Sequence, residues 1–411
     1  MLGRTLPGLG GKSLLIFDES LMSKSDHWFE YDLAIARMHA ASGAEVEIVS
    51  HRTFAFEADL EAVGATVLPL AEQNFQTVSG RGGAIGEWAV GVRLAWHFSR
   101  LLSRLLAART YDCVFYHTAQ PMHLLSWKFL SRRLRKRAGR VVFATWLNPA
   151  VYDTEGNPVF PRRRKLWRLA AQLLRAEFAS DHFVFLTDSA RVAEEYRLLA
   201  GLEAGHICSP RTMFASSGPP RSSSQKRFVL PGAARVEKGI DVFQEAIAGA
   251  DDLADPTRFQ FIVQWNKPVY DASDNPYPRD VRLGQRENFT FLDDELSSAQ
   301  YQELLHSADC VVLPYRLSGY RSRTSAVAIE AACAGVPMIY TDGGWLGDFV
   351  REFGAGIAVA DGDERALAGA VRRMREELSV FKAQAAECSE SARQANSPEA
   401  FLTALWGRRH D

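Results

Sequence analysis

The chain has 411 residues, of which 47% are hydrophobic and 24% are charged, a balance typical of folded globular proteins. This length exceeds one ordinary domain, so two domains of about 200 residues each are expected. No apolar run approaches the ~20 residues that span a bilayer, and residues 1–13 lack the apolar core of a signal peptide. The five cysteines include no CxxC pair, which argues against a disulfide framework and indicates reduced thiols in a cytoplasmic protein.

The net charge of −1 conceals a strong segregation of charge along the chain. Residues 85–175 contain 17 Lys or Arg and four acidic residues, so this window carries +13 and the remainder −14. Such a basic region would attract an anionic membrane surface or nucleic acid. Because the sequence has no signature motif of nucleic-acid recognition, we expect no nucleic-acid partner and favour a membrane surface.

The first half alternates short apolar runs with longer amphipathic segments. The apolar runs predict buried strands at 13–18, 45–49, 67–70, 111–116, 141–146, 183–187 and 206–209. Helices are predicted at 28–41, 84–108, 122–136, from 161 onward and at 189–199. Alternation of this kind predicts a doubly wound parallel sheet.

Three of these helices carry basic side chains beside apolar ones, which suits a peripheral protein at an anionic membrane, where each basic residue contributes about 1 kcal/mol. Ordinary solvated helix faces would show the same stripes, and that alternative stays open. Trp167, the one aromatic candidate, lies off the basic arc of its helix. The candidate membrane-facing residues are Arg100, Arg104, Arg132, Arg133, Arg164, Lys165, Trp167 and Arg168.

Residues 215–226, ASSGPPRSSSQK, have the lowest complexity in the chain and predict an interdomain linker. The expected organisation is a first domain at 1–214, a second at 227–390, and a C-terminal helix within 391–411 that can pack back on the first domain. Beyond the linker, strands are predicted at 227–231, 259–264, 288–291, 310–314 and 338–341. Helices are predicted at 241–248, 298–307, 324–334, 363–378 and 398–406.

Three loops of the second half should meet at the carboxyl edge of its sheet, where open parallel sheets bind ligands. They span residues 232–240, 315–325 and 341–346. They offer cations and the free N–H groups at the start of a helix, a combination that binds a diphosphate well. The candidate residues of this binding site are Gly232, Arg235, Lys238, Arg321, Arg323, Thr324, Ser325, Glu330, Gly343 and Gly344.

Glu330 is the one charged residue in an otherwise small and apolar helix. A carboxylate in such a place costs stability unless something hydrogen-bonds it. We therefore interpret it as a ligand contact, suited to the hydroxyls of a ribose attached to the diphosphate.

These residues carry a resemblance. The second half is similar to the nucleotide-binding domain of GT-B glycosyltransferases, closest to the family 4 type. Gly232 to Gly239 matches the first loop of that domain, Glu330 to Pro337 the second glutamate of its two-glutamate motif, and Thr341 to Gly344 its third loop. The resemblance implies two facing Rossmann-like domains with a cleft between them, and a nucleoside diphosphate-sugar donor. It also implies transfer without a metal or cofactor, and retention of anomeric configuration rather than inversion.

Two departures from that pattern concern the donor. Ala233 stands where the family has an arginine, which leaves Arg235 as a substitute, and Ser322 stands where it has the first glutamate. Because that glutamate contacts the donor sugar in the family, its loss leaves the donor sugar and the stereochemical outcome open. Arg321 and Arg323 could instead contact an acidic sugar or an additional phosphate.

The first half resembles the acceptor domain of the same fold in outline only. His117, just past a predicted strand, matches the position where the family often holds a histidine that faces the donor sugar. His27 and Asp18 are further candidates for acceptor-binding or base residues. A surface loop residue or a strand-end cap is the alternative for each of the three.

The predicted function is transfer of a sugar to a lipid-linked or polysaccharide-precursor acceptor, a glycolipid or oligosaccharide, at the inner face of the membrane. A nucleotide-sugar hydrolase or epimerase, or a catalytically silent binding subunit, remains as an alternative. No metal site is expected, because the acidic pairs lie in polar turns and the histidines lack ligand spacing.

Overall fold

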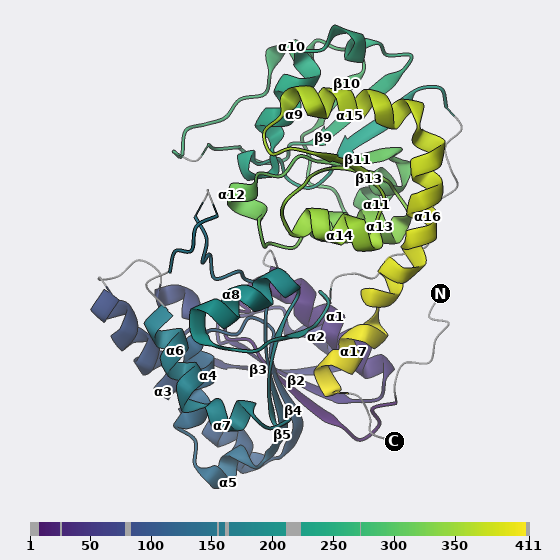
Figure 1. Cartoon of the computed structure of the whole chain (residues 1–411). Coiled ribbons are helices and arrows are strands. Elements are labelled where there is room, and N and C mark those ends of the chain that lie inside the picture. Colours follow the sequence, from purple (N-terminus) through teal and green to yellow (C-terminus); the bar gives the residue numbers. More distant parts are fainter. Residues whose placement is uncertain are drawn as a thin grey trace. The chain divides into compact units, whose positions relative to one another are not determined.

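The computed structural model describes residues 8–24, 27–78, 84–153, 156–160, 164–210, 223–271 and 273–407. The chain forms two compact units, residues 1–211 with 397–411 and residues 212–396. Each unit is a parallel sheet covered by helices on both faces (Figure 1). Residues 215–222 of the predicted linker lie outside the described part, and Lys226 already belongs to the first strand of the second unit.

The first unit is built on a parallel sheet in the order β3-β2-β1-β4-β5-β6-β7. Its strands are β1 (Ser13–Phe17), β2 (Glu45–His51), β3 (Ala65–Ala71), β4 (Tyr111–Tyr116), β5 (Ala138–Thr145), β6 (Phe183–Thr187) and β7 (Gly205–His206). Every position of β1 is buried and four of its five residues are apolar, because helices cover both faces of the sheet. The strand order reverses between β1 and β4, which is the point where such sheets bind ligands.

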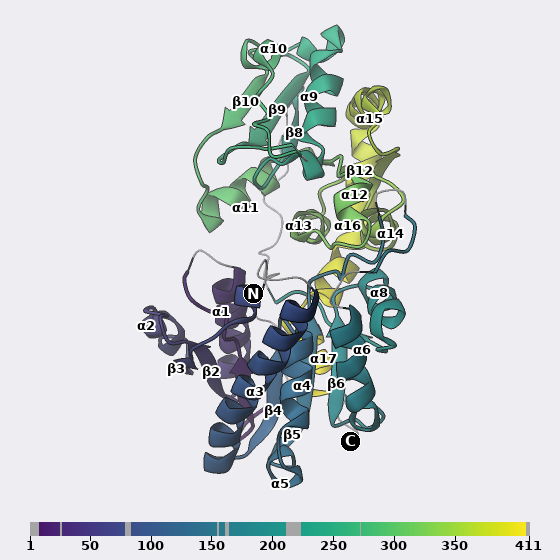
Figure 2. The ribbon, with the colours of Figure 1, turned by 90° about the vertical axis from the view of Figure 1, so that its left-hand side faces the viewer.

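Helices cover the two faces of this sheet in separate sets (Figure 2). One face packs against α3 (Ala84–Ala108), α4 (Pro121–Lys128), α6 (Arg164–Leu173) and α8 (Ala190–Ala200). The other packs against α1 (His27–Ala41), α2 (Glu57–Glu61) and α17 (Pro398–Trp406). The return of α17 ties the end of the chain to the first unit through buried Phe401, Leu402 and Leu405.

The predicted helix at 122–136 is two helices in the structure. The first, α4, ends at Lys128, and α5 (Arg132–Arg135) starts after Ser131. The hydroxyl of Ser131 accepts a hydrogen bond from the backbone N–H of Leu134 at 3.3 Å, which caps α5 as a separate turn. A further short helix, α7 (Arg175–Phe178), follows α6.

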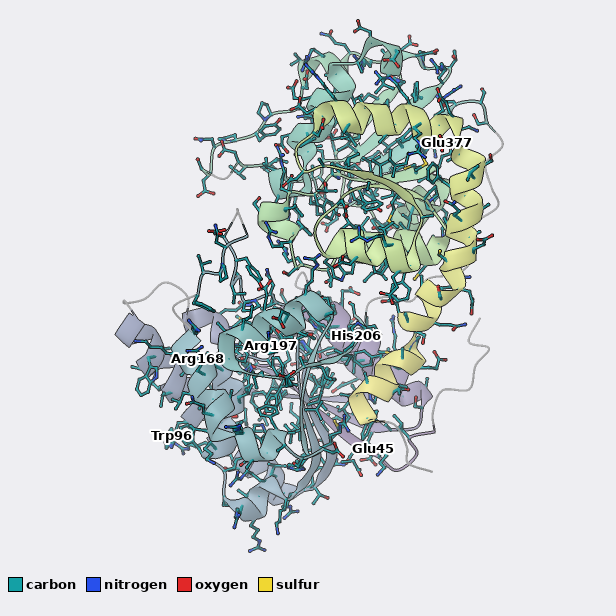
Figure 3. The ribbon with its side chains drawn as sticks, in the orientation of Figure 1. Glu45, Trp96, Arg168, Arg197, His206 and Glu377 are labelled. Atoms are coloured by element: carbon teal, nitrogen blue, oxygen red, sulfur yellow. The ribbon has the colours of Figure 1, made fainter. Side chains whose placement is uncertain are left out.

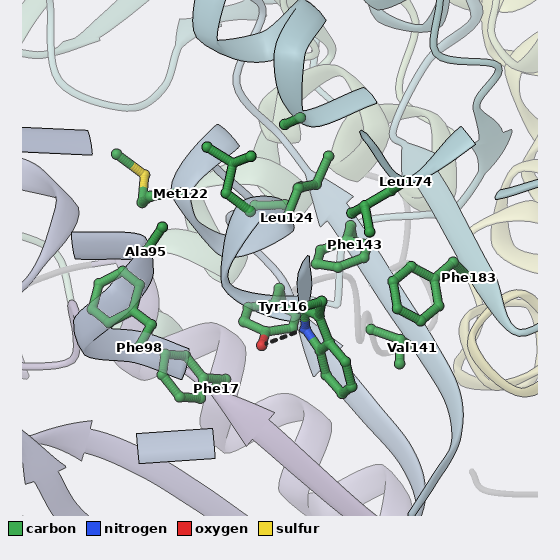
Figure 4. Packing of buried hydrophobic residues seen from close by; sticks show 14 of the residues in the cluster. Phe17, Ala95, Phe98, Tyr116, Met122, Leu124, Val141, Phe143, Leu174 and Phe183 are labelled. Atoms are coloured by element: carbon green, nitrogen blue, oxygen red, sulfur yellow. Dashed lines mark hydrogen bonds between the residues drawn. The ribbon is translucent and has the colours of Figure 1, made fainter. Parts of the chain in front are cut away.

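Aromatic side chains fill the core between the first sheet and its α3–α8 face (Figure 4). Phe17, Tyr116 and Phe143 come from three strands and pack ring against ring, with centroids 5.3 and 5.1 Å apart along the row. Trp127 Nε1 donates a hydrogen bond to Tyr116 Oη at 2.9 Å, drawn as a dashed line in Figure 4. This bond satisfies two polar groups that are wholly buried.

The second unit has a parallel sheet in the order β10-β9-β8-β11-β12-β13. Its strands are β8 (Lys226–Leu230), β9 (Phe259–Gln264), β10 (Phe289–Leu292), β11 (Cys310–Leu313), β12 (Met338–Thr341) and β13 (Gly356–Val359). One face packs against α9 (Ile240–Ala248), α10 (Val281–Gly284) and α15 (Glu364–Glu376). The other packs against α11 (Ser298–Ser307), α13 (Ala326–Ala334) and α14 (Trp345–Phe353), and α16 (Leu378–Ala395) contributes to both. Here the order reverses between β8 and β11.

The same hairpin follows a strand in each unit and is an internal repeat. The segment 151–158 follows β5 and the segment 269–276 follows β9, and both read Val-Tyr-Asp, three further residues, Asn-Pro. In each, the aspartate carboxylate accepts a hydrogen bond from the backbone N–H of the asparagine, at 2.8 Å in the first and 2.9 Å in the second. An antiparallel bridge from Tyr to Pro closes each hairpin. The two hairpins follow strands at different places in their sheets, because β5 lies beyond β4 whereas β9 lies beside β8, on the side away from β11.

Candidate functional site

The carboxyl edge of β8, β11 and β12 brings the three predicted loops of the second unit into contact. Gly239 has a φ of 73°, and a Cβ there would lie 1.8 Å from the carbonyl oxygen of Pro314. A Cβ on Gly344 would lie 3.1 Å from the carbonyl oxygens of both Tyr320 and Arg321. Only glycine fits at Gly239. These close approaches show that the loops after the three strands pack against one another at the point where strand order reverses.

Lys238 is the central cation of this surface. A Cβ on Gly232 would lie 3.0 Å from the Nζ atom of Lys238, so the ammonium sits directly over the glycine backbone. Burial lowers the pKa of Lys238 to about 8, and the charges of Arg235 and Arg323 act in the same direction. Within the described part of the chain Lys238 makes no ion pair. An anionic ligand stabilises a desolvated ammonium more strongly than a solvated one.

Glu237, which the sequence analysis did not single out, organises the cations around Lys238. Its Oε1 atom accepts from Arg235 Nη1 at 3.2 Å and from Arg323 Nη1 at 3.3 Å. The guanidinium of Arg323 also lies over the ring of Tyr320, 4.7 Å from its centroid. One carboxylate therefore holds two arginines beside the lysine, and the group of three cations keeps a net positive charge.

Glu330 has a protein partner, which its position in an apolar helix made necessary. The hydroxyl of Tyr301, on α11, donates a hydrogen bond to Glu330 Oε2. Every other residue of α13 except Ala326 is buried, and Ser325 caps the helix by accepting from Ala328 N at 3.2 Å. Because Tyr301 lies 29 residues before Glu330, no spacing rule could have paired them.

The remaining candidate donor-binding residues frame this centre. Ser322, in the place of the family's first glutamate, is 2% exposed and is not available to a ligand in this structure. The carbonyl oxygen of Arg321 accepts a hydrogen bond from the backbone N–H of Trp345 at 2.8 Å, which links the loop after β11 to α14. Gly343 has a φ of 91°, and Thr324 is half-buried before the cap of α13. Gln264 accepts from Gly232 N at 2.7 Å and fixes the first loop.

In the first unit, Asp18 and His117 meet at the point where strand order reverses. Asp18 directly follows β1 and His117 directly follows β4, and α1 adds Asp32, which the sequence analysis missed. His117 Nε2 lies 3.3 Å from Asp18 Oδ2 and 3.2 Å from Asp32 Oδ1. The three side chains are 1%, 3% and 0% exposed for His117, Asp18 and Asp32. We call them the Asp-His-Asp cluster.

The electrostatics of the Asp-His-Asp cluster favour a charged imidazole. Burial opposes a charge on His117, but the two carboxylates outweigh it and raise the pKa of His117. Burial also raises the pKa of Asp32, against the effect of His117. The Nδ1 atom of His117 is within 3.0 Å of Thr118 Oγ1, so both ring nitrogens face protein groups. The two carboxylates therefore favour the imidazolium form of His117 over the neutral form.

Aromatic rings surround the Asp-His-Asp cluster. Trp28 stacks on His117 with ring centroids 5.9 Å apart, and Tyr31 approaches the same ring edge-on at 5.9 Å. The neighbouring carboxylate of Glu19 pairs with His123 Nε2 at 2.8 Å, also in the interior. His27 is the first residue of α1, and its side chain lies outside the described part.

The Asp-His-Asp cluster also has a composition that metals use. Its two carboxylates and one imidazole each offer one ligand atom, and these atoms lie within 4.8 Å of one another. Carboxylate and imidazole ligands suit zinc and other transition metals. The ion pairs of His117 account for the same geometry without a metal, so removal of divalent cations is the experiment that separates the two possibilities.

Most of the candidate membrane-facing residues lie at the surface of the first unit. Arg100, Arg104, Arg132, Arg133, Lys165 and Arg168 are exposed and Arg164 is half-buried. Arg100 lies over exposed Trp96, 4.9 Å from its ring, and Trp96 and Arg168 are labelled in Figure 3. Trp167 is a correction: it is 4% exposed and packs edge-on against Phe185 and Tyr196, so it cannot face a membrane. None of the helices in the described ranges is long and apolar enough to cross a bilayer.

Comparison with known families identifies the second unit. Residues 225–377 match the family model described as glycosyl transferases group 1. A stretch of 90 residues is 34% identical to the glycogen synthase of Mycobacterium tuberculosis (strain ATCC 25618 / H37Rv), covering 22% of this chain and 21% of that protein. The match thus spans about a fifth of the length of the curated relative.

Solved structures resemble the whole chain at low sequence identity. TarM gives a TM-score of 0.65 at 10% identity, over 98% of this chain and 100% of that one. Anabaena HepE in complex with UDP gives 0.60 at 14%, over 95% and 97%. Sucrose-phosphate synthase from Thermosynechococcus elongatus gives 0.58 at 14%, over 96% of each chain. Likeness at this identity shows the fold alone: the chain has the GT-B fold, and the resemblance predicted for its second half is confirmed.

Proposed function

We propose that the protein is a glycosyltransferase that moves a sugar from a nucleoside diphosphate-sugar to a lipid-linked or polysaccharide-precursor acceptor at the cytoplasmic face of the membrane. The match of residues 225–377 to glycosyl transferases group 1 supports transfer, and the HepE complex with UDP supports a nucleotide donor. The observation that carries the proposal is Lys238, a desolvated cation without an ion pair among the described residues, set over Gly232.

In this proposal the donor diphosphate lies over the loop that follows β8. Lys238 binds the phosphate oxygens, and Arg323 and Arg235, held in place by Glu237, stand on either side of that contact. The carboxylate of Glu330 accepts hydrogen bonds from the ribose hydroxyls and is oriented by its hydrogen bond from Tyr301. Lys238, Arg235 and Arg323 come from the loops that follow β8 and β11, whereas Glu330 and Tyr301 come from helices α13 and α11.

The chemistry proposed for these cations is stabilisation of the leaving group. As the bond between the anomeric carbon and the diphosphate oxygen breaks, negative charge accumulates on the diphosphate. In this proposal Lys238 and Arg323 neutralise that charge, and charge placed in advance requires no reorganisation during the reaction. We propose no metal and no cofactor, because the cations of the protein supply the charge themselves.

A retained anomeric configuration fits the first unit better than inversion. Inversion by direct displacement needs a base within reach of the acceptor hydroxyl. In the described part of this unit, the carboxylates and imidazole at the β1–β4 junction are buried and paired with one another. We therefore propose that Asp18 and His117 act as positioning residues beside the acceptor, with His27 as a further acceptor-side residue.

The second candidate function is a nucleotide-sugar hydrolase or epimerase, or a silent binding subunit. Buried Ser322 favours it, because the loop lacks the carboxylate that contacts the donor sugar in the family. Thermal stabilisation across nucleoside mono- and diphosphates and their sugars tests the shared premise. A diphosphate present at a hundred times its Kd should add about 2.7 kcal/mol to the unfolding free energy. If no nucleoside diphosphate stabilises the chain, both candidate functions fail.

A further inference from the structure

The amino edge of the first sheet carries two adjoining hollows that the candidate site does not use. One, of about 900 Å³, lies among the ends of α4 and α6, the short helices α5 and α7, and the start of β6. The other, of about 760 Å³, lies among α7, the end of α8 and the starts of β6 and β7. They have five lining residues in common, Gln172, Arg175, Ala179, Ser180 and Phe183. Asp18 and His117 lie at the opposite, carboxyl end of the strands.

The first hollow is strongly basic, and we call it the basic hollow. Its only carboxylate, Glu177, binds Arg135 at 2.6 Å and lies 3.9 Å from Lys128. Within the described residues, Arg132, Lys136 and Arg175 form no ion pair. With His182 neutral, the net charge is +4, from one carboxylate and the five cations Lys128, Arg132, Arg135, Lys136 and Arg175.

The second hollow is mainly apolar, and we call it the apolar hollow. Eleven of its 16 lining residues are Ala, Gly, Val, Leu or Phe. Phe183, Phe185 and Leu202 are buried beneath it and belong to the core of the unit, so its floor is a fixed hydrophobic surface. Arg175 lines both hollows and marks the passage from charged to apolar surface.

We propose that the two hollows together bind one phosphate-bearing lipid, with the phosphate group in the basic hollow and hydrocarbon in the apolar hollow. A soluble anion would leave the apolar hollow uncovered, and a neutral lipid would leave an excess of cations without a counterion. The apolar hollow adds the carboxylates Asp181 and Glu203, so the two linings together carry a net charge of +2, concentrated in the basic hollow. An anionic amphiphile matches both at once. This inference rests on the proposed function for its setting, because it gives the proposed membrane association a defined lipid site.

Vesicle binding by the full chain tests the charged half of the site. The vesicles are phosphatidylcholine alone and phosphatidylcholine with a minority of phosphatidylglycerol. Exposed Arg132 and Lys136 can be replaced without disturbing the core, and Arg132→Gln with Lys136→Gln should weaken binding to the anionic vesicles about thirtyfold. The matched control, Lys267→Gln with Arg365→Gln, removes two exposed cations from the second unit and should leave binding unchanged. Binding that ignores phosphatidylglycerol, or an equal loss in the control, overturns the proposal.

Competition in solution tests the apolar half. Dioctanoyl phosphatidic acid and glycerol 3-phosphate share a phosphate and differ in their hydrocarbon chains. The lipid should displace the protein from anionic vesicles at a much lower concentration, and Ala204→Gln, in the apolar hollow, should remove that advantage while the melting temperature is retained. If glycerol 3-phosphate competes equally well, the site binds soluble anions and the lipid assignment is wrong.

Nucleotide binding by the same variants separates this inference from the proposed function. The Arg132→Gln and Lys136→Gln double variant should bind UDP as the parent does, because both residues lie outside the second unit. Loss of vesicle binding with intact UDP binding supports the lipid site. Absence of UDP binding in the parent, with lipid binding intact, refutes only the proposed function.

Discussion

Replacing Lys238 with methionine should weaken nucleotide binding and stabilise the free protein at the same time. Methionine keeps most of the side-chain volume over Gly232 but removes the ammonium. A ligand that restores the pKa of Lys238 from about 8 to the ordinary 10.5 would contribute about 3 kcal/mol. Solvent screening makes that figure an upper bound, and hydrogen bonds to charged groups contribute about 1.5–3 kcal/mol. We therefore expect UDP to bind about ten- to a hundredfold more weakly.

Calorimetric titration of UDP into the Lys238→Met variant measures the loss directly. Lys267→Met is the matched control, because Lys267 is exposed in the same unit and forms no ion pair with a described residue. The melting temperature of the free Lys238→Met protein should rise, since a desolvated charge has been removed. Unchanged UDP affinity would refute the assignment of Lys238 to the diphosphate, and a lower melting temperature would show that the ammonium has an internal partner.

Further expectations concern pH, Glu330, the Asp-His-Asp cluster and metals. Because burial lowers the pKa of Lys238 to about 8, UDP affinity should fall as the pH rises above 8. The stability of the free protein should instead rise between about pH 8 and 10.5, because the unfolded chain holds more protons than the folded chain in that range. The Lys238→Met variant should show neither trend. Tyr301→Phe should weaken UDP binding several-fold, mainly because the carboxylate of Glu330 loses its hydrogen bond. An equal loss of affinity for a diphosphate without a ribose would contradict the assignment of Glu330 to the ribose. His117→Ala should destabilise the chain by about 3–5 kcal/mol, because it leaves two buried carboxylates without a cation; equal melting temperatures for parent and variant would count against the buried ion pairs. Treatment with EDTA should leave turnover unchanged, and a loss restored by a divalent cation would contradict transfer without a metal; if Asp32→Asn abolished that restoration, the metal would belong to the Asp-His-Asp cluster.

The meeting of the loops after β8, β11 and β12 was predictable from sequence, because the carboxyl ends of neighbouring parallel strands lie at one edge of the sheet. Lys238 stands in a glycine-bounded loop after an apolar strand, and Glu330 interrupts an apolar helix. Both signals are local. Glu237, Tyr301 and Gln264 were missed because their roles depend on contacts between separate junctions, which no periodicity records.

The first unit was less predictable for the same physical reason. Asp32 lies on a helix with other polar residues, and only the packing of α1 against the sheet buries it beside His117. Trp167 was misassigned because a basic arc beside it suggested a membrane face, whereas its position next to Leu166 places it on the core side of α6. The hairpin repeat after β5 and β9 was present in the sequence as Val-Tyr-Asp and Asn-Pro, a pattern with neither strand nor helix period.

Transfer of labelled sugar is the most direct measurement of the central claim. The full chain is incubated with a panel of nucleoside diphosphate-sugars labelled in the sugar, with and without a membrane extract as the source of acceptor. We predict that one donor passes its label to material in the extract, that little label is released without the extract, and that Lys238→Met strongly reduces the transfer. Release of free sugar at the same rate with and without the extract would contradict the claim and identify a hydrolase. Binding of nucleotides without turnover of any donor would contradict it in favour of a silent subunit.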